Sequence, residues 1–278
     1  MDTEELFKGF TEPDSECVEG LSGSCLSKTS EKQLKEFVDE PHGKIEDYIE
    51  AAKEKSGCTE MKCVAKKLHE EYLKKDVVDP KVETTLREDV KYNFKPFGPR
   101  EGTMWLSNVD IEGVLEKWSN IYRDKVVVFP YCMIDFEKTG ELFNDIDLES
   151  LRKKKYMAMC VLNTDVSSGP GKHWICTCID MSTDSPTIEY FDSGGRPPPK
   201  PLYKKLLSLS VEHKVKILMS SVVHQRKNTE CGVYCLYFLD SRLRGRDFSF
   251  FTDKRISDEN IQIFRKYLFA PNIKDGKK

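Results

Sequence analysis

The sequence predicts an α+β protein in two parts, a small helical arm domain over residues 1–95 and a core domain over residues 96–278. Before residue 80 the apolar residues recur at helical spacing, whereas beyond residue 125 strand-like and helix-like runs alternate. Residues 95–102 are dense in proline and glycine, as in a linker. Residues 1–95 carry 16 Lys and Arg against 23 Asp and Glu, and the remainder carries 28 against 24. This charge asymmetry favours two parts with different roles.

The composition restricts the class of protein. A chain of 278 residues can bury a core large enough to fold without disulfides or metals. The net charge of -3 does not indicate a nucleic-acid-binding protein. The start of the chain is acidic, and the longest apolar run, Val126–Ile134, contains Pro130 and is shorter than the roughly 20 residues of a membrane span. We therefore expect a soluble protein of a reducing compartment, without cofactor or membrane partner, whose ten cysteines are mostly free thiols.

The arm domain has three segments with helical periodicity. Ser30 and Gln33 have the spacing of a capping box and predict that a helix begins there. A second helix is predicted from Lys44 to Lys55, ended by Gly57, and a third from about Met61 to Lys75.

Two further features of the arm domain have simple interpretations. Residues 1–28 are polar and indicate a loosely ordered lead-in. Cys58, Cys63 and His69 have no second pair of metal ligands near them, so we interpret them as structural residues.

The core domain opens with a helix start. Trp105 precedes Ser107 and Asn108, either of which can cap a helix that continues to Tyr122. The rest of the core is a succession of shorter elements. We expect strands over residues 125–129, 156–162, 173–180, 187–192 and 214–220, a basic turn over 150–155, and helices over 201–209 and 261–268.

Cys231 stands where a polar run ends and a buried apolar helix is predicted to begin. The first N–H groups of a helix have no internal partners and its dipole is positive there, which favours a thiolate. Gly232 would leave room for a substrate backbone beside the sulfur. Considered alone, a cysteine in such a place is more often a buried structural residue.

A base and an orienting group for such a thiol come from two neighbouring strands. His173 opens the strand over 173–180, and Asp192 ends the strand over 187–192. If the two strands pair as a hairpin, the imidazole has a carboxylate to hold its tautomer and a free nitrogen for the thiol.

Two amides precede the cysteine. Gln225 and Asn228 lie six and three residues before Cys231, and either can donate to the oxyanion of a tetrahedral intermediate. We interpret Cys176 and Cys178, which share one face of a strand, as core residues.

Four sequence pieces in this order resemble a known family. The pieces are similar to motifs of the cysteine peptidases that process ubiquitin-like proteins. They are His-Trp at 173–174, Tyr-Phe-Asp-Ser-x-Gly at 190–195, Gln-x5-Cys-Gly at 225–232 and Trp-Leu-x-Asn-x-x-Ile at 105–111. This family includes SUMO proteases and adenovirus protease, and the resemblance covers residues from about 97 to 270. It implies a mixed central sheet flanked by helices and a catalytic set of His173, Asp192, Gln225 and Cys231.

Within the family, the chain most resembles the polyprotein-processing proteases of African swine fever virus and related large DNA viruses. It departs from that branch at Asp192, where the branch has Asn, and at Asn228, where it has Gln; we favour Gln225 as the oxyanion donor. The resemblance implies cleavage after Gly-Gly in a structural polyprotein during virion maturation, by a monomer located in host cytoplasm and virion. It also places Trp105 and Trp174 beside the scissile peptide, with Asn108, Asn228 and Gly232 at the substrate-binding site.

Other functions remain open from the sequence alone. The first is a deconjugase that releases SUMO or a ubiquitin-like protein with the same chemistry. Another is acetyl transfer, since some bacterial acetyltransferases share the order of the triad, although no feature here favours acetyl-CoA. The third is a catalytically inactive binding module, against which the intact set of catalytic residue types argues.

Overall fold

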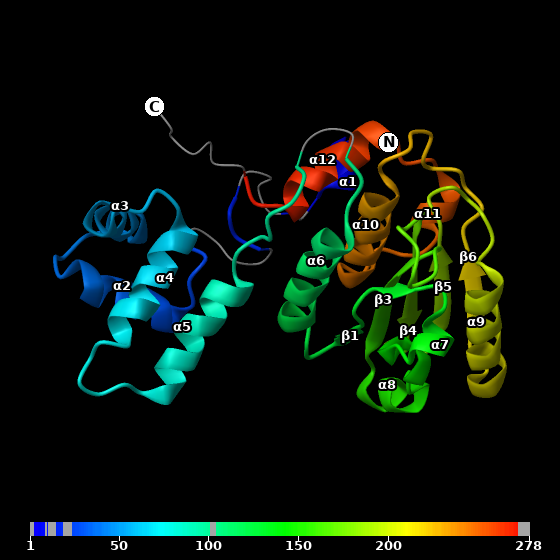
Figure 1. Ribbon diagram of the computed structural model, residues 1–278, viewed down its shortest axis with the longest axis horizontal. Helices are drawn as coiled ribbons and strands as arrows, with labels where there is room; N and C mark the ends of the chain where they lie inside the picture. The colour runs from blue at the N-terminus through cyan, green and yellow to red at the C-terminus, as the bar shows by residue number, and fades with distance from the viewer. Residues whose placement is uncertain (1–2, 9, 11–14, 19–23, 101–103, 272–278) are drawn as a thin grey trace. The chain divides into compact units, whose positions relative to one another are not determined.

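The computed structural model describes residues 3–8, 10, 15–18, 24–100 and 104–271 (Figure 1). The chain divides into two compact units. The smaller comprises Gly9–Phe97 with Lys266–Lys278, and the larger comprises Gly98–Arg265 with Met1–Lys8. Within the described residues, no helix is both long and apolar enough to cross a membrane.

The smaller unit is a helical bundle around one apolar core. Its helices are α2 (Lys28–Val38), α3 (Ile45–Ser56), α4 (Met61–Tyr72) and α5 (Pro80–Tyr92). α3 ends at Gly57, which adopts the left-handed conformation predicted for it. α5 was not predicted from the sequence, although its signals are clear. Asp79 accepts a hydrogen bond from the main-chain N–H of Lys81, and Pro80 occupies the first turn, where its missing N–H costs nothing.

The start of α2 differs from the prediction. Ser27, not Ser30, is the cap, and its hydroxyl accepts a hydrogen bond from the Ser30 N–H. The carboxylate of Asp89, from α5, accepts a hydrogen bond from the Ser27 N–H at 2.8 Å. Ser30 is fully buried inside the first turn. A long-range contact therefore sets the helix start, and the local pattern placed it three residues late.

The cysteines are mostly free thiols, as predicted, but four of them form two disulfides in the smaller unit. Cys17 pairs with Cys25, and Cys58 pairs with Cys63. The first bond lies in the segment predicted to be a loosely ordered lead-in, part of which is outside the described residues. Cys17 also forms a β-bridge with Phe94, so the described part of this segment is tied to the chain beyond α5. The six cysteines of the larger unit are free thiols.

The larger unit is built on a mixed sheet, which confirms the predicted α+β class. Its strands are β1 (Val126–Val128), β2 (Cys132–Met133), β3 (Met157–Asn163), β4 (Trp174–Asp180), β5 (Thr187–Phe191) and β6 (Lys216–Met219). They are ordered β1-β3-β4-β5-β6, and β2 also pairs with β3. The β3-β4 and β4-β5 pairs are antiparallel and the others are parallel.

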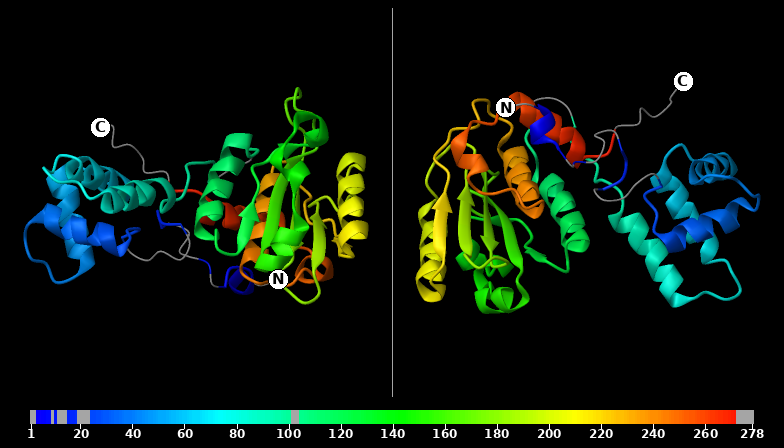
Figure 2. Two further views of the ribbon diagram at one scale, coloured as in Figure 1. Left: turned by 90° about the horizontal axis from the view of Figure 1, so that it is seen from below. Right: turned by 180° about the vertical axis from the view of Figure 1, so that it is seen from behind.

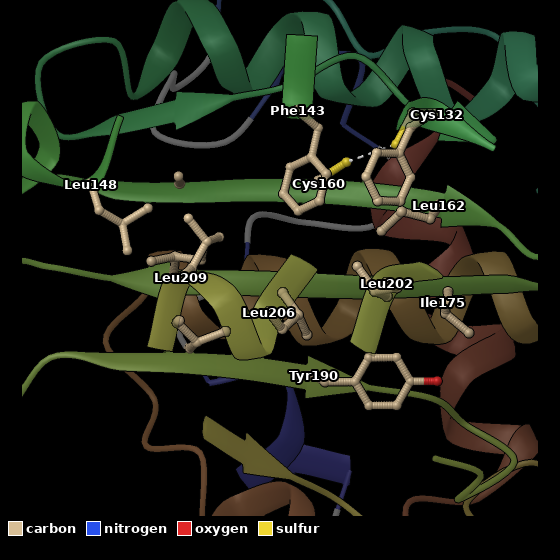
Figure 3. Packing of buried hydrophobic residues seen from close by; sticks show 14 of the residues in the cluster. Cys132, Phe143, Leu148, Cys160, Leu162, Ile175, Tyr190, Leu202, Leu206 and Leu209 are labelled. Carbon is tan, nitrogen blue, oxygen red and sulfur yellow. Dashed lines mark hydrogen bonds between the residues drawn. The ribbon is translucent and has the colours of Figure 1, made fainter. Parts of the chain in front are cut away.

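The remaining helices are α1 (Thr3–Leu6), α6 (Asn108–Ile121), α7 (Phe136–Thr139), the 3-10 helix η1 (Leu142–Asp145), α8 (Leu148–Lys154), α9 (Lys200–His213), α10 (Cys231–Leu243), α11 (Phe250–Asp253) and α12 (Asp258–Leu268). Among them, α6, α9 and α10 contact strands of the sheet. Leu202, Leu206 and Leu209 of α9 pack with Ile175 and Tyr190 of the sheet in one apolar cluster (Figure 3). α9 also runs beside β6 (Figure 2). α10 packs against β4, where the Cys176 thiol approaches the carbonyl oxygen of Cys235 at 3.7 Å.

One element of the larger unit was predicted wrongly. Residues 150–155, expected as a basic turn, belong to α8 up to Lys154. Asp147 caps this helix by accepting from the Ser150 N–H at 2.9 Å, and Lys155 ends it in the left-handed conformation. The basic side chains lie in the last turn, where they complement the negative end of the helix dipole.

Candidate active site

The hairpin of β4 and β5 brings His173 and Asp192 together, as predicted. His173 immediately precedes β4, and Asp192 immediately follows β5. The Nε2 atom of His173 lies 2.7 Å from the Oδ1 atom of Asp192. The carboxylate is almost fully buried and also accepts a hydrogen bond from the Gly194 N–H at 2.7 Å. Its position is therefore fixed independently of the imidazole.

Cys231 reaches the same imidazole from another part of the fold. It is the first residue of α10 and is buried, with 3% of its surface exposed. Burial acts to lower the pKa of His173, but hydrogen bonds to Asp192 and to Cys231, with the negative charge of both groups, raise it to about 9. The imidazole therefore interacts with both a carboxylate and a thiol. Such an arrangement has the elements of a cysteine nucleophile with its general base and an orienting carboxylate.

Gln225 is hydrogen-bonded to Ser193, the residue that follows Asp192. Its main-chain N–H donates to the carbonyl oxygen of Ser193 at 2.9 Å, and its side-chain oxygen accepts from the Ser193 hydroxyl at 2.7 Å. Its amide nitrogen donates to the carbonyl oxygen of Lys227 at 2.8 Å. This geometry orients the amide, whose second N–H can serve another acceptor. Asn228 is exposed on the same loop.

A groove of about 420 Å³ adjoins His173 and holds three of the predicted substrate-binding residues, Trp105, Asn108 and Trp174. Trp174 is 5% exposed, and its indole N–H donates to the carbonyl oxygen of Leu106 at 2.9 Å. Trp105 is 51% exposed at the start of the segment before α6. One indole is therefore fixed in the protein and the other is open to a ligand.

The expected reason for Gly232 is corrected by the packing. A Cβ added to this residue would lie 3.1 Å from Trp174 Cδ1, 3.2 Å from Leu106 Cβ and 3.3 Å from Ile111 Cδ1. The space beside this glycine is therefore filled by side chains of the protein itself. Gly232 allows α10 to approach the groove wall closely, and it does not leave an open space for substrate at that point.

Two side chains that were not predicted from the sequence, Asn163 and Asp165, fix the loop before His173. Asn163 Oδ1 accepts from the N–H groups of Asp165 and Lys172, both at 3.0 Å. Asp165 accepts from the Gly171 N–H at 3.1 Å and from the Lys172 ammonium at 2.8 Å. The hydrogen bond from Lys172 is the main cause that lowers the pKa of Asp165. The glycines at this loop tip were the available signal, because they allow the backbone to pass close to the Asp165 carboxylate.

The other buried histidine of the core has a structural environment. The Nε2 atom of His224 lies 3.0 Å from the carbonyl oxygen of Phe251, and its Nδ1 accepts from the Ile256 N–H at 3.1 Å. Burial lowers its pKa to about 4, so the ring is neutral at physiological pH. Cys176 and Cys178 are fully buried, as predicted for core residues.

Comparisons with known proteins agree with this geometry. Residues 134–277 match the model of the Ulp1 protease family, C-terminal catalytic domain. A cysteine protease of African swine fever virus, isolate Tick/Malawi/Lil 20-1/1983, is 33% identical over 95% of this chain and 98% of its own. A protein named SUMO-1 cysteine protease, from isolate Tick/South Africa/Pretoriuskop Pr4/1996 of the same virus, has the same identity and coverage. A crystal structure of the African swine fever virus protease superposes with a TM-score of 0.69 and 32% identity, covering 94% of this chain and 97% of that one.

Proposed function

Because the chain belongs to the Ulp1 protease family and is a cysteine protease, we propose that it cleaves peptide bonds after Gly-Gly with Cys231 as its nucleophile. The observation that carries this proposal is the imidazole of His173, which is hydrogen-bonded to Asp192 and also interacts with Cys231. A nucleophile, a base and an orienting carboxylate in one hydrogen-bonded series are the elements of covalent acyl transfer.

In the proposed reaction, the Cys231 thiolate attacks the scissile carbonyl carbon and forms a tetrahedral intermediate. The oxyanion accepts hydrogen bonds from the Cys231 main-chain N–H at the start of α10 and from the side-chain amide of Gln225, and Asn228 is the alternative side-chain donor. His173, held by Asp192, gives a proton to the leaving amine as the C–N bond breaks. A water molecule then gives a proton to His173 and attacks the thioester, which expels the Cys231 thiolate, releases the acid and restores the starting thiolate–imidazolium pair.

The groove beside His173 supports glycine before the cut. Its walls include Trp105 and Trp174, and a substrate backbone that passes between two indole rings has little space for a Cβ. Glycine enters such a slot without steric cost. We therefore assign Trp105, Trp174 and Asn108 to the substrate-binding site. A screen of peptides with varied residues on both sides of the cut tests this assignment; efficient cleavage with Ala at either glycine position would contradict it.

For the biological substrate, we propose a viral structural polyprotein that is cut during virion maturation, in host cytoplasm and in the virion, by a monomer. The likeness to a cysteine protease of African swine fever virus along nearly the whole chain supports a viral role. The acidic arm, residues 1–95, is not required by the chemistry, and we assign to it the positioning of large substrates.

A deconjugase for SUMO or a similar protein is the second candidate, because some of the relatives from African swine fever virus are named SUMO-1 cysteine proteases. The two functions are separated by offering the full chain two substrates at equal concentration. One is a polyprotein segment with Gly-Gly-x junctions, and the other is a SUMO conjugate. Release of SUMO without cleavage of the junctions would establish the deconjugase, and the reverse result would establish polyprotein processing.

A further inference from the structure

Arg265 is a fully buried cation in the larger unit. It lies on α12, and none of its surface is exposed. Moving a charged side chain out of water costs free energy unless hydrogen bonds or opposite charges compensate. A buried guanidinium therefore requires polar partners inside the protein, and the identity of these partners indicates what it holds.

The partners are main-chain carbonyl groups from two segments that are far apart in the sequence. Nη1 donates to the carbonyl oxygen of Met104 at 2.9 Å and to that of Pro99 at 3.2 Å. Nη2 donates to the carbonyl oxygen of Thr229 at 3.3 Å. Met104 is the residue before Trp105, which lines the groove, and Thr229 is two residues before Cys231. One planar side chain therefore connects the groove wall to the approach to the nucleophile.

A second side chain of α12 supports the same approach. The amide nitrogen of Gln262, three residues before Arg265 and on the same helix face, donates to the carboxylate of Glu230 at 2.8 Å. Glu230 is 1% exposed and accepts from the hydroxyl and the N–H of Thr229, both at 2.9 Å. Two side chains of α12 therefore hold this dipeptide: Arg265 binds the carbonyl oxygen of Thr229, and Gln262 binds the carboxylate of Glu230.

The charge of Arg265 also acts on the nucleophile. Burial lowers the pKa of Arg265, whereas the negative charges of Glu230, Asp110 and a Cys231 thiolate oppose that shift. The guanidinium is thus close enough to Cys231 for the two groups to interact electrostatically.

We propose that Arg265 is a positioning residue for the peptidase reaction: its guanidinium fixes the distance between the Trp105 wall of the groove and the Cys231 nucleophile. The proposal rests on the proposed function for the role of Cys231. The two can be tested separately, because the reactivity of the Cys231 thiol can be measured without any peptide substrate.

The test compares Arg265→Met, Arg265→Lys and the unchanged protein. The rate of alkylation of Cys231 by iodoacetamide at neutral pH is followed by mass spectrometry, and kcat and KM are measured with a Gly-Gly-x peptide. Arg265→Met removes the hydrogen bonds to both segments, so Cys231 loses its fixed place and should be alkylated roughly 10-fold more slowly. Arg265→Lys keeps the charge but lacks the planar fork that reaches both segments, and should slow alkylation in the same direction. Both variants should lose roughly 10- to 100-fold in kcat/KM, because small errors in position reduce the rate by such factors.

Arg242→Lys is the matched control, because it shows how far the loss of any buried guanidinium disturbs the fold and lowers the activity. Arg242 is also buried, but it pairs with Asp180 and Glu189 and lies eleven residues beyond Cys231, about 16 Å along α10. An unchanged alkylation rate in folded Arg265→Met would overturn the proposal. If that variant does not fold, Arg265→Lys decides: a kcat/KM reduced no more than in Arg242→Lys also overturns it. Failure of the unchanged protein to cleave any Gly-Gly-x peptide would count against the proposed function alone, because the alkylation result stands without it.

Discussion

His173 and Asp192 are 19 residues apart in the chain, yet their side chains meet at 2.7 Å because β4 and β5 pair antiparallel. The pairing aligns Cys176 with Phe191, so the chain just before β4 and the chain just after β5 lie at one end of the hairpin. The hydrogen bond from the Gly194 N–H to Asp192 fixes the carboxylate in the turn that follows. The orientation of the imidazole is thus a product of the sheet register.

Asp192→Asn should retain much of the activity. An amide oxygen in the same place can accept from both the imidazole and the Gly194 N–H. The loss of a charged acceptor weakens one hydrogen bond by about 1 kcal/mol, which corresponds to roughly a fivefold lower rate. His173→Ala should cost roughly 10²–10⁴ in kcat, because it removes the general base. Steady-state kinetics with a Gly-Gly-x peptide compares the two variants. Equal losses would show that Asp192 contributes its charge and not only an orientation.

The raised pKa of His173 predicts a pH-dependent contribution to stability. Its pKa is about 9 in the folded protein and about 6.5 in an unfolded chain. The protonated imidazole therefore stabilises the fold fully below pH 6.5, and this contribution is lost as the pH rises through 9. Urea unfolding at several pH values should show a difference in free energy of unfolding between the unchanged protein and His173→Ala that shrinks over this interval. A difference that is constant with pH would contradict the expectation.

Cys231→Ser should fold normally and lose nearly all activity, because a hydroxyl is much harder to deprotonate than this thiol. Cys235→Ser, one helical turn further on, provides the comparison. Cys235 is fully buried, and burial raises the pKa of its thiol well above the usual value, so it is not a nucleophile near neutral pH. That variant should lose stability and keep its chemistry. Peptide cleavage and thermal unfolding, measured on both variants, separate these roles, and the opposite pattern would remove Cys231 from the proposed reaction.

Gln225→Ala and Asn228→Ala test which amide stabilises the oxyanion. We expect Gln225→Ala to lower kcat by roughly 10²–10³, the usual effect of losing one such donor. Asn228 is exposed, and its replacement should have a much smaller effect. Because Gln225 also holds Ser193, circular dichroism should accompany the kinetics. An unchanged kcat in Gln225→Ala with a large loss in Asn228→Ala would transfer the role to Asn228.

Gly232→Ala should destabilise the fold by about 1–3 kcal/mol, as overpacking of a tight interior does. The added methyl group would lie 3.1–3.3 Å from Trp174, Leu106 and Ile111, so one of these side chains must shift. Chemical unfolding measures the effect. Gly43→Ala is the control, because the nearest atom to its added methyl is 4.0 Å away, and it should change the stability by less than about 0.5 kcal/mol. Equal stability of both variants would show that α10 and the groove wall adapt easily.

The sequence by itself determined the elements around the site, because local patterns carry that information. The change from a polar to an apolar run at Cys231 predicted the helix start where α10 begins, and the runs ending in Asp180 and Asp192 predicted β4 and β5. The order of short motifs predicted the family.

Only the tertiary structure decided which residues make contact. The start of α2 depends on Asp89, 62 residues away from Ser27, and Gly232 is required because Trp174 and Leu106 fill the space beside it. Arg265 has no local signal at all, since its partners are main-chain carbonyls up to 166 residues distant. Helical and strand periodicity arise from neighbours in the chain, whereas burial and hydrogen bonding across the fold arise from packing, which no local pattern records.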